Sequence, residues 1–231
     1  TRRYGEFCAL LLSIVLGGFL MVSATDLLMM YLALEMVSIP SYILSGFQKE
    51  LRRSNEAAVK YVIYGGVSSG VMIYGMSLIY GMTGTTNLYK MAEALSASPP
   101  YPLALFLGLA FTLAGFGYKV AAAPFHFWCP DVYEGAPTPV TAFLSIAPKA
   151  AGFAMLARFF YSGLAHRIGS DLVFIGVDWP LLLAVMSAFT MTLGNAVAIW
   201  QNNLKRLLAY FSIAHAGYLM MGVVTLSQEG L

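Results

Sequence analysis

Charged residues are scarce in this sequence. Asp, Glu, Lys and Arg make up only 10% of its 231 residues, against about 25% in ordinary soluble domains. Hydrophobic residues make up 59%, and the mean hydropathy is +0.73. So few charges cannot cover a water-exposed surface. The composition therefore excludes a soluble globular domain and indicates a membrane protein.

Cysteine and clustered basic residues are also rare. The two cysteines, Cys8 and Cys129, lie in apolar surroundings as small hydrophobic residues, so a disulfide framework is not supported. The net charge is only +2, and tracts of Lys and Arg with interleaved aromatics are missing, which excludes nucleic acid as a partner. No nucleotide fingerprint, phosphate loop or nucleophile elbow is present. Redox cofactors have no evident ligands, so we expect none bound to this chain.

Long apolar runs are what the sequence does contain. A membrane-spanning helix needs about 20 mostly apolar residues, and seven runs qualify, near residues 7–25, 27–47, 58–82, 102–123, 137–163, 179–200 and 205–226. None has the alternation of a membrane-barrel strand, and helices satisfy their own backbone groups in lipid. We predict an all-α polytopic transmembrane helix bundle with antiparallel neighbours. Residues 83–101, rich in Gly, Thr, Ser and Pro, predict an extramembrane loop.

Basic residues outside the runs predict the orientation. If the helices alternate, one side of the membrane receives Arg2, Arg3, Lys49, Arg52, Arg53, Lys205 and Arg206, and the other receives Lys90, Arg158 and Arg167. The first side is predicted to be cytoplasmic, together with the N-terminus. The chain starts at Thr1 rather than Met and ends in what looks like an interrupted loop, so we expect it to be a fragment of a longer protein.

Three charged residues lie inside the predicted spans, where a charge costs roughly 2.5–3.5 kcal/mol on insertion scales. Glu35 is either a proton or ion site or one half of a structural ion pair. Lys119 lies one turn before a predicted helix break at Pro124, and its alternative role is snorkelling to the interface. Lys149 lies too deep for easy snorkelling, and the adjacent Pro148 frees a carbonyl that could accept a hydrogen bond from it.

Together, these three residues on three helices form a candidate proton relay, because each can be charged or neutral. Two further residues are candidates. Lys60 follows Glu56 by four residues, so a surface ion pair is the alternative. His215 lies among small residues and could relay a proton or make one interhelical hydrogen bond. Lys205 and Arg206 are expected to anchor a helix end.

Residues 124–139, PFHFWCPDVYEGAPTP, are the densest motif. Four prolines exclude a continuous spanning helix here. A short half-helix at membrane depth is tolerated only where it is buried in protein or lines a cavity, and such helices occur at transporter ion sites. A metal site of His126, Cys129 and Asp131 lacks enough ligands at a recognised spacing.

The segment KVAAAPFHFWCPDVYEGAPTPVTAF, residues 119–143, resembles the antiporter-like membrane subunits of respiratory complex I, and within them the subunit N type of bacterial NADH–quinone oxidoreductase. NNLKRLLAYFSIAHAGY, residues 202–218, supports the resemblance, which covers essentially the whole chain. It implies two inverted five-helix repeats with a broken helix in each. Residues 1–163 would form the first repeat, and residues 164–231 would begin the second.

The resemblance also implies residue roles and partners. Glu35 and Lys119 occupy the positions of a glutamate–lysine pair, Lys149 that of a lysine on the next helix, and Lys60 and His215 match further polar positions. The chain would move protons, coupled to quinone reduction in other subunits. NADH, FMN, Fe–S clusters and quinone would bind in those partner subunits. Its neighbours would be lipid and other membrane subunits of complex I, especially antiporter-like ones, in the bacterial plasma membrane.

Two alternatives remain open from the sequence. A subunit of a multisubunit Na⁺/H⁺ antiporter or of a membrane-bound hydrogenase would share the relay motifs and differ in its partners. A purely structural membrane spacer would tolerate neutral residues at the three buried charged positions.

Overall fold

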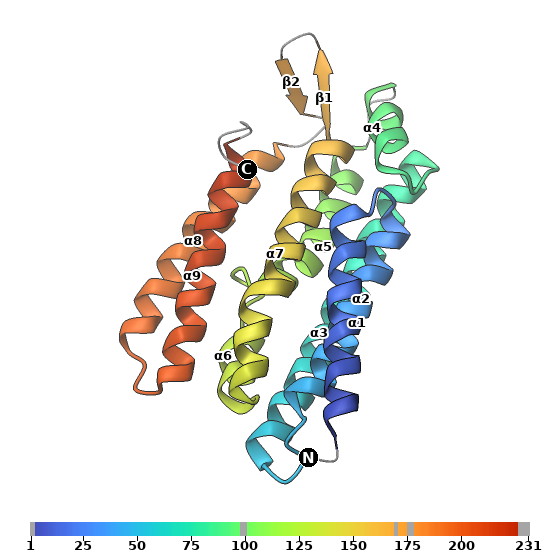
Figure 1. The fold of residues 1–231 in the computed structure, drawn as a ribbon. Helices are drawn as coiled ribbons and strands as arrows, with labels where there is room; N and C mark the ends of the chain where they lie inside the picture. Colours follow the sequence, from blue (N-terminus) through green and yellow to red (C-terminus); the bar gives the residue numbers. More distant parts are fainter. Residues whose placement is uncertain (1–2, 98–100, 169–170, 175–177, 226–231) are drawn as a thin grey trace.

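The computed structural model describes residues 3–97, 101–168, 171–174 and 178–225, which form an elongated helix bundle (Figure 1). Seven of the described helices are long and apolar enough to cross a membrane, which confirms the predicted number. These seven are α1 (Tyr4–Ser23), α2 (Leu27–Ser45), α3 (Arg52–Thr83), α5 (Pro102–Val120), α7 (Thr138–Gly163), α8 (Trp179–Ile199) and α9 (Leu204–Val224).

The longest helix, α3, begins at Arg52, whereas the predicted run began near residue 58. Its first turns are polar and carry no hydropathy signal, so only the structure reveals them. With 32 residues and a rise of about 1.5 Å per residue, α3 is longer than the hydrocarbon core of about 30 Å. Its polar first turns would therefore lie beyond the hydrocarbon core.

A short helix, α4 (Leu88–Ala97), interrupts the segment predicted as an extramembrane loop. Leu88, Met91 and Leu95 are buried on one side of it, the spacing of an amphipathic helix. The Asn87 side chain accepts hydrogen bonds from the first backbone amides and so caps its N-terminus. Ten residues with one apolar face are too few to stand out from a loop in a hydropathy profile.

A two-stranded antiparallel hairpin connects α7 to α8 at one end of the bundle. It consists of β1 (Ala165–Ile168) and β2 (Asp171–Phe174), with Ala165 opposite Phe174. Figure 1 shows it projecting beyond the helix ends. These two four-residue strands are the only strands among the described residues, so the fold class is all-α, as predicted.

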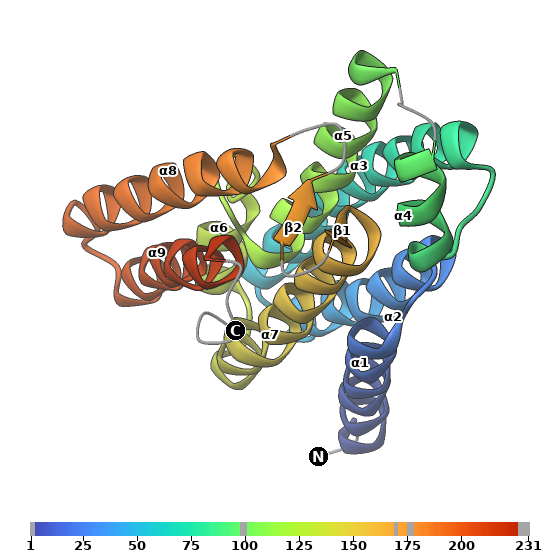
Figure 2. The same cartoon turned by 90° about the horizontal axis from the view of Figure 1, so that it is seen from above.

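Three helix pairs build the bundle: α1 with α2, α3 with α5, and α8 with α9. Helix α7 lies between them and contacts α1, α2, α5 and α9. Seen from above, the α8–α9 pair lies beside α6 and α7, away from α1 (Figure 2). Contact between this pair and the rest of the bundle runs mainly through α6 and α7.

Two glycines allow close helix approach, as is common between membrane helices. A Cβ at Gly75 of α3 would lie 2.6 Å from the backbone nitrogen of Thr112 on α5. A Cβ at Gly194 of α8 would lie 2.7 Å from the backbone nitrogen of Ala214 on α9. Side chains at these positions would force each pair of helices apart.

The predicted helix break lies between α5 and α6 (Trp128–Gly135). Helix α5 ends at Val120, before the predicted limit near residue 123. Ala121 adopts the left-handed conformation with φ 60°. The amide of Ala121 bonds the carbonyl of Tyr118, and the amide of Ala122 bonds that of Gly117, which is the Schellman pattern of helix termination. The indole of Trp128 also donates to the Tyr118 carbonyl, so backbone groups freed at membrane depth are satisfied.

Candidate functional site

Lys119 lies in the last turn of α5, immediately before the break, and is only 3% exposed. Its ammonium nitrogen donates to the Ser38 hydroxyl of α2 at 2.9 Å. Snorkelling does not fit this position, because the side chain ends against another helix rather than at an interface. The broken helix thus delivers a lysine into the bundle interior.

Glu35 lies on α2, one turn before Ser38, and is half-buried. Its Oε1 atom is buried and has no hydrogen-bond partner among the described residues. The ion pairs of the described chain do not join Glu35 to Lys119. The direct glutamate–lysine pair implied by the resemblance is therefore not formed in this structure, and Ser38 takes the lysine instead.

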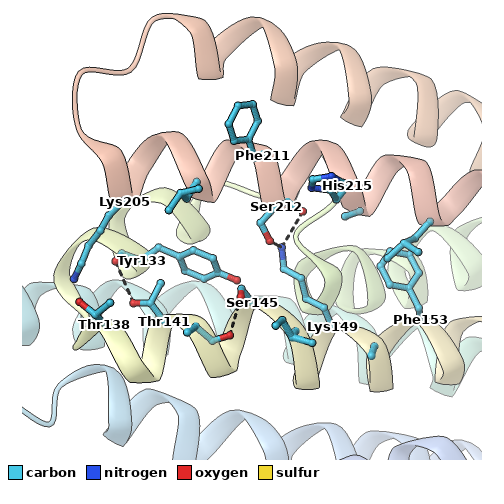
Figure 3. A pocket seen from close by; sticks show the side chains of 16 residues that line it. Tyr133, Thr138, Thr141, Ser145, Lys149, Phe153, Lys205, Phe211, Ser212 and His215 are labelled. Carbon is cyan, nitrogen blue, oxygen red and sulfur yellow. Dashed lines mark hydrogen bonds between the residues drawn. The ribbon is translucent and has the colours of Figure 1, made fainter.

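Lys149 lies in the middle of α7 and is 6% exposed. Its nitrogen lies 2.6 Å from the hydroxyl and 3.2 Å from the carbonyl oxygen of Ser212 on α9 (Figure 3). The nitrogen also lies 5.7 Å from the centre of the Tyr133 ring of α6, a distance that allows a cation–π contact. Three helices therefore meet at this lysine.

A cavity of about 600 Å³ lies along the contact between α7 and α9. Most of its lining is apolar, and its polar groups include Lys149, Lys205, Ser212 and His215 (Figure 3). His215 is exposed, follows Ser212 by one turn, and packs edge-on against Tyr218. Its side chain makes no hydrogen bond within the part of the chain that the structure describes, so the interhelical bond considered from the sequence is not formed here.

Both lysine sites border α7, one turn apart along the helix. A Cβ at Gly152, one turn after Lys149, would lie 3.3 Å from Cγ of Lys119. The missing side chain at Gly152 lets the aliphatic part of Lys119 pass along α7 toward Ser38. The structure therefore brings Lys119 and Lys149 to neighbouring helices, although each nitrogen has its own partner.

Lys60 belongs to a separate ionic cluster at the end of the bundle near the N-terminus. It pairs with Glu56 at 2.8 Å, as the alternative reading predicts, and also with Asp131 of α6 at 2.7 Å. Asp131 in turn pairs with Arg206 of α9 at 2.6 Å, and Arg206 also bonds Glu134 at 3.1 Å. We call Lys60, Asp131, Glu134 and Arg206 the α6 cluster.

The α6 cluster shows what sequence reasoning missed. The sequence predicts for Asp131 only a possible role as a metal ligand, and it predicts no role for Glu134. Their spacing of three residues places both carboxylates on one side of a helix, which was the available signal. Lys205 donates to the Ala136 carbonyl at 2.9 Å, beyond the end of α6. Lys205 and Arg206, in the first turn of α9, therefore also anchor the end of α6.

The α6 cluster also sets the ionisation of Asp131, which lies outside the seven spans. Partial burial raises the pKa of its carboxyl, but hydrogen bonds from Lys60 and Arg206 lower it by more. The pKa of Asp131 therefore lies below its ordinary value of 3.8. The carboxyl remains a carboxylate at neutral pH.

Seven spans around a helix interrupted beside a buried lysine define a multi-pass membrane protein with a discontinuous helix. The chain belongs to the NADH:quinone oxidoreductase/Mrp antiporter transmembrane family, whose model matches residues 24–231. It is 57% identical over 231 residues to NADH-quinone oxidoreductase subunit N 2 of Chloroherpeton thalassium. That alignment covers 100% of this chain and 45% of the relative.

Two solved structures have the same fold. A chain of respiratory complex I from Thermus thermophilus superposes with a TM-score of 0.78 at 38% identity, covering 94% of this chain and 45% of that chain. A chain of a membrane-bound sulfane sulfur reductase, an archaeal respiratory membrane complex, superposes with a TM-score of 0.80 at 30% identity, covering 94% and 43%. The chain thus spans less than half the length of these relatives.

Proposed function

We propose that this chain is part of the proton-translocating membrane subunit of a NADH–quinone oxidoreductase, of the subunit N type. In this proposal protons move through a relay of Glu35, Lys119, Lys149, Lys60 and His215. NADH, FMN, Fe–S clusters and quinone act in partner subunits, and this chain contributes no redox step. The 57% identity to a subunit of that name supports the choice of complex.

One observation carries the relay: two lysines are buried in the spans, and each ends on a neutral hydroxyl rather than on a carboxylate. A hydroxyl both accepts from an ammonium and donates to an amine. Neither protonation state therefore leaves the nitrogen without a partner. An intramembrane ionisable group with such freedom is suited to passing a proton on.

The division into repeats belongs to the same proposal. Helices α1 to α7, residues 1–163, would form the first repeat with its broken helix. Residues 164–231 would begin a second, of which this chain carries α8 and α9. The separate packing of the α8–α9 pair supports this division.

Neutral substitution of the buried lysines tests the relay. In inside-out vesicles carrying the assembled complex with the full-length subunit, we expect Lys119→Met to lower proton uptake at least about tenfold, because a proton carrier is lost. The matched control is Lys90→Met on α4, which removes an exposed lysine outside the spans and should leave uptake unchanged. Wild-type uptake in the Lys119→Met variant would refute the relay and favour a structural spacer.

A second candidate is a subunit of a cation/proton antiporter, and the family description, which includes Mrp antiporters, favours it. Purification of the full-length protein from its native membrane in mild detergent separates the two. Co-purification of flavin and NADH-dependent quinone reduction supports the oxidoreductase. A large assembly without either supports the antiporter or a related respiratory complex.

A further inference from the structure

Both buried lysines contact a serine on another helix, and each serine lies one turn from a relay candidate. On α2, Ser38 contacts Lys119 and follows Glu35 by three residues. Such a spacing places two side chains on the same side of a helix. The lysine thus lies beside a hydroxyl and near a carboxylate whose Oε1 atom has no hydrogen-bond partner among the described residues.

The second site repeats the arrangement on α9. Ser212 contacts Lys149 through both its hydroxyl and its carbonyl oxygen, and His215 follows it by three residues. Ser212 and His215 border the same cavity (Figure 3). The ring of Tyr133 on α6 lies 5.7 Å from the Lys149 ammonium nitrogen.

Building on the proposed function, we propose that Ser38 and Ser212 are positioning residues of the relay. Each hydroxyl holds the nitrogen of one buried lysine at a helix–helix contact, within a turn of the group that next exchanges a proton. The serine and the neighbouring relay group are then alternative partners for the same lysine.

The hydrogen bonds of Ser38 fit this role. Its hydroxyl donates to the Leu34 carbonyl of its own helix at 2.7 Å, which leaves its lone pairs to accept from Lys119. A hydroxyl can also rotate to donate once the lysine is neutral. Within the described structure no backbone carbonyl accepts from the Ser212 hydroxyl, so it can turn to donate to a neutral Lys149 without losing such a bond.

Two matched pairs of variants test the proposal. Ser38→Ala is compared with Ser41→Ala, since Ser41 is buried on the same helix but donates only to the Val37 carbonyl. Ser212→Ala is compared with Ser145→Ala, whose hydroxyl borders the same cavity but bonds the Ala142 carbonyl of its own helix. All are made in the full-length subunit of the assembled complex.

The measured quantity is proton uptake per NADH oxidised in inside-out vesicles, normalised to the amount of assembled complex. A hydrogen bond to a charged group is lost in each test variant, so we expect a fall of about threefold to tenfold for Ser38→Ala and Ser212→Ala. Ser41→Ala and Ser145→Ala should match the wild type. Ser212→Thr, which keeps the hydroxyl at a half-buried site, should restore most of the uptake.

Three results overturn the proposal: wild-type uptake in both test variants, an equal fall in test and control variants, or no recovery in Ser212→Thr. If Ser38→Ala assembles poorly, the Ser212 series decides. The proposed function fails separately. If the Lys119→Met variant still pumps protons, the relay itself is refuted. If Lys119→Met does not pump but Ser38→Ala and Ser212→Ala do, only the positioning role of the serines is refuted.

Discussion

At the scale of single residues, the buried lysines Lys119 and Lys149 differ from Lys60 in the charge of their partners. Lys119 and Lys149 contact serines, whereas Lys60 contacts two carboxylates. An ammonium between two carboxylates is held in its charged form. Lys60 is therefore ion-paired to α6, unlike a relay group that exchanges its proton freely. Its role in the relay stays a prediction.

Asp131 offers a residue-scale test of the α6 cluster. Asp131→Asn removes the carboxylate shared by Lys60 and Arg206, and since these side chains are about one-third exposed, we expect a loss of about 1 kcal/mol. The pKa of Asp131 is lowered in the folded state. Its stabilising effect is thus present at neutral pH and disappears as the pH falls through that lowered value.

Thermal unfolding of the purified complex should therefore show a deficit for Asp131→Asn near neutral pH that narrows on acidification. Glu93→Gln on α4 is the control, because this exposed carboxylate has no ion pair within the described residues. The deficit should stay constant down to about pH 4 and narrow only below the ordinary value of 3.8. A deficit that persists unchanged as the pH falls through the lowered pKa of Asp131 would contradict the assignment of the effect to this carboxylate.

At the scale of elements, α6 links α3 to α9. The eight-residue half-helix has ionic contacts with α3 on one side and α9 on the other. Its Tyr133 ring also faces Lys149. A displacement of α6 would therefore change both the ion pairs at the bundle end and the surroundings of the buried Lys149.

Close packing of α8 on α9 yields a prediction for these elements. Gly194→Val places a side chain where a Cβ alone meets the Ala214 backbone at 2.7 Å, so we expect a cost of about 1–3 kcal/mol from overpacking. Gly70→Val on α3 is the control, because no atom lies within 4 Å of its Cβ position. The measurement is the thermal stability of the assembled complex, and equal stability of the two variants would disprove the close contact.

At the scale of the whole molecule, the basic connections gather at one end. The α2–α3 and α8–α9 connections lie at the same end as the N-terminus (Figure 1). Lys49 lies in the first connection, and the helices that follow carry Arg52, Arg53, Lys205 and Arg206 in their first turns. The positive-inside rule predicts that this end faces the cytoplasm. The α4 helix and the hairpin then lie on the opposite side.

Cysteine labelling tests this orientation. In a Cys8→Ser background, which removes the exposed native thiol, Glu50→Cys should react with a membrane-impermeant maleimide in inside-out vesicles only. Lys90→Cys on α4 should react in right-side-out vesicles only. The reverse pattern would invert the predicted topology, while the contacts within the bundle would be unaffected.

The sequence alone determined the number of spans, the break near Pro124 and the buried lysines, since each depends on local properties: hydropathy over about 20 residues, a missing proline amide and the cost of burying a charge. Helix ends were less well determined where the flanking turns are polar, as at Arg52 of α3. The short amphipathic helix α4 was missed for a similar reason.

Only the tertiary structure decided which groups meet. Ser38 lies 81 positions from Lys119, Ser212 lies 63 positions from Lys149, and Asp131 lies 71 positions from Lys60. Such contacts depend on the rotation and separation of packed helices, which are set by close-packed residues such as Gly75 and Gly194. A hydropathy profile shows that a lysine is buried, but the helix against which it packs selects its partner.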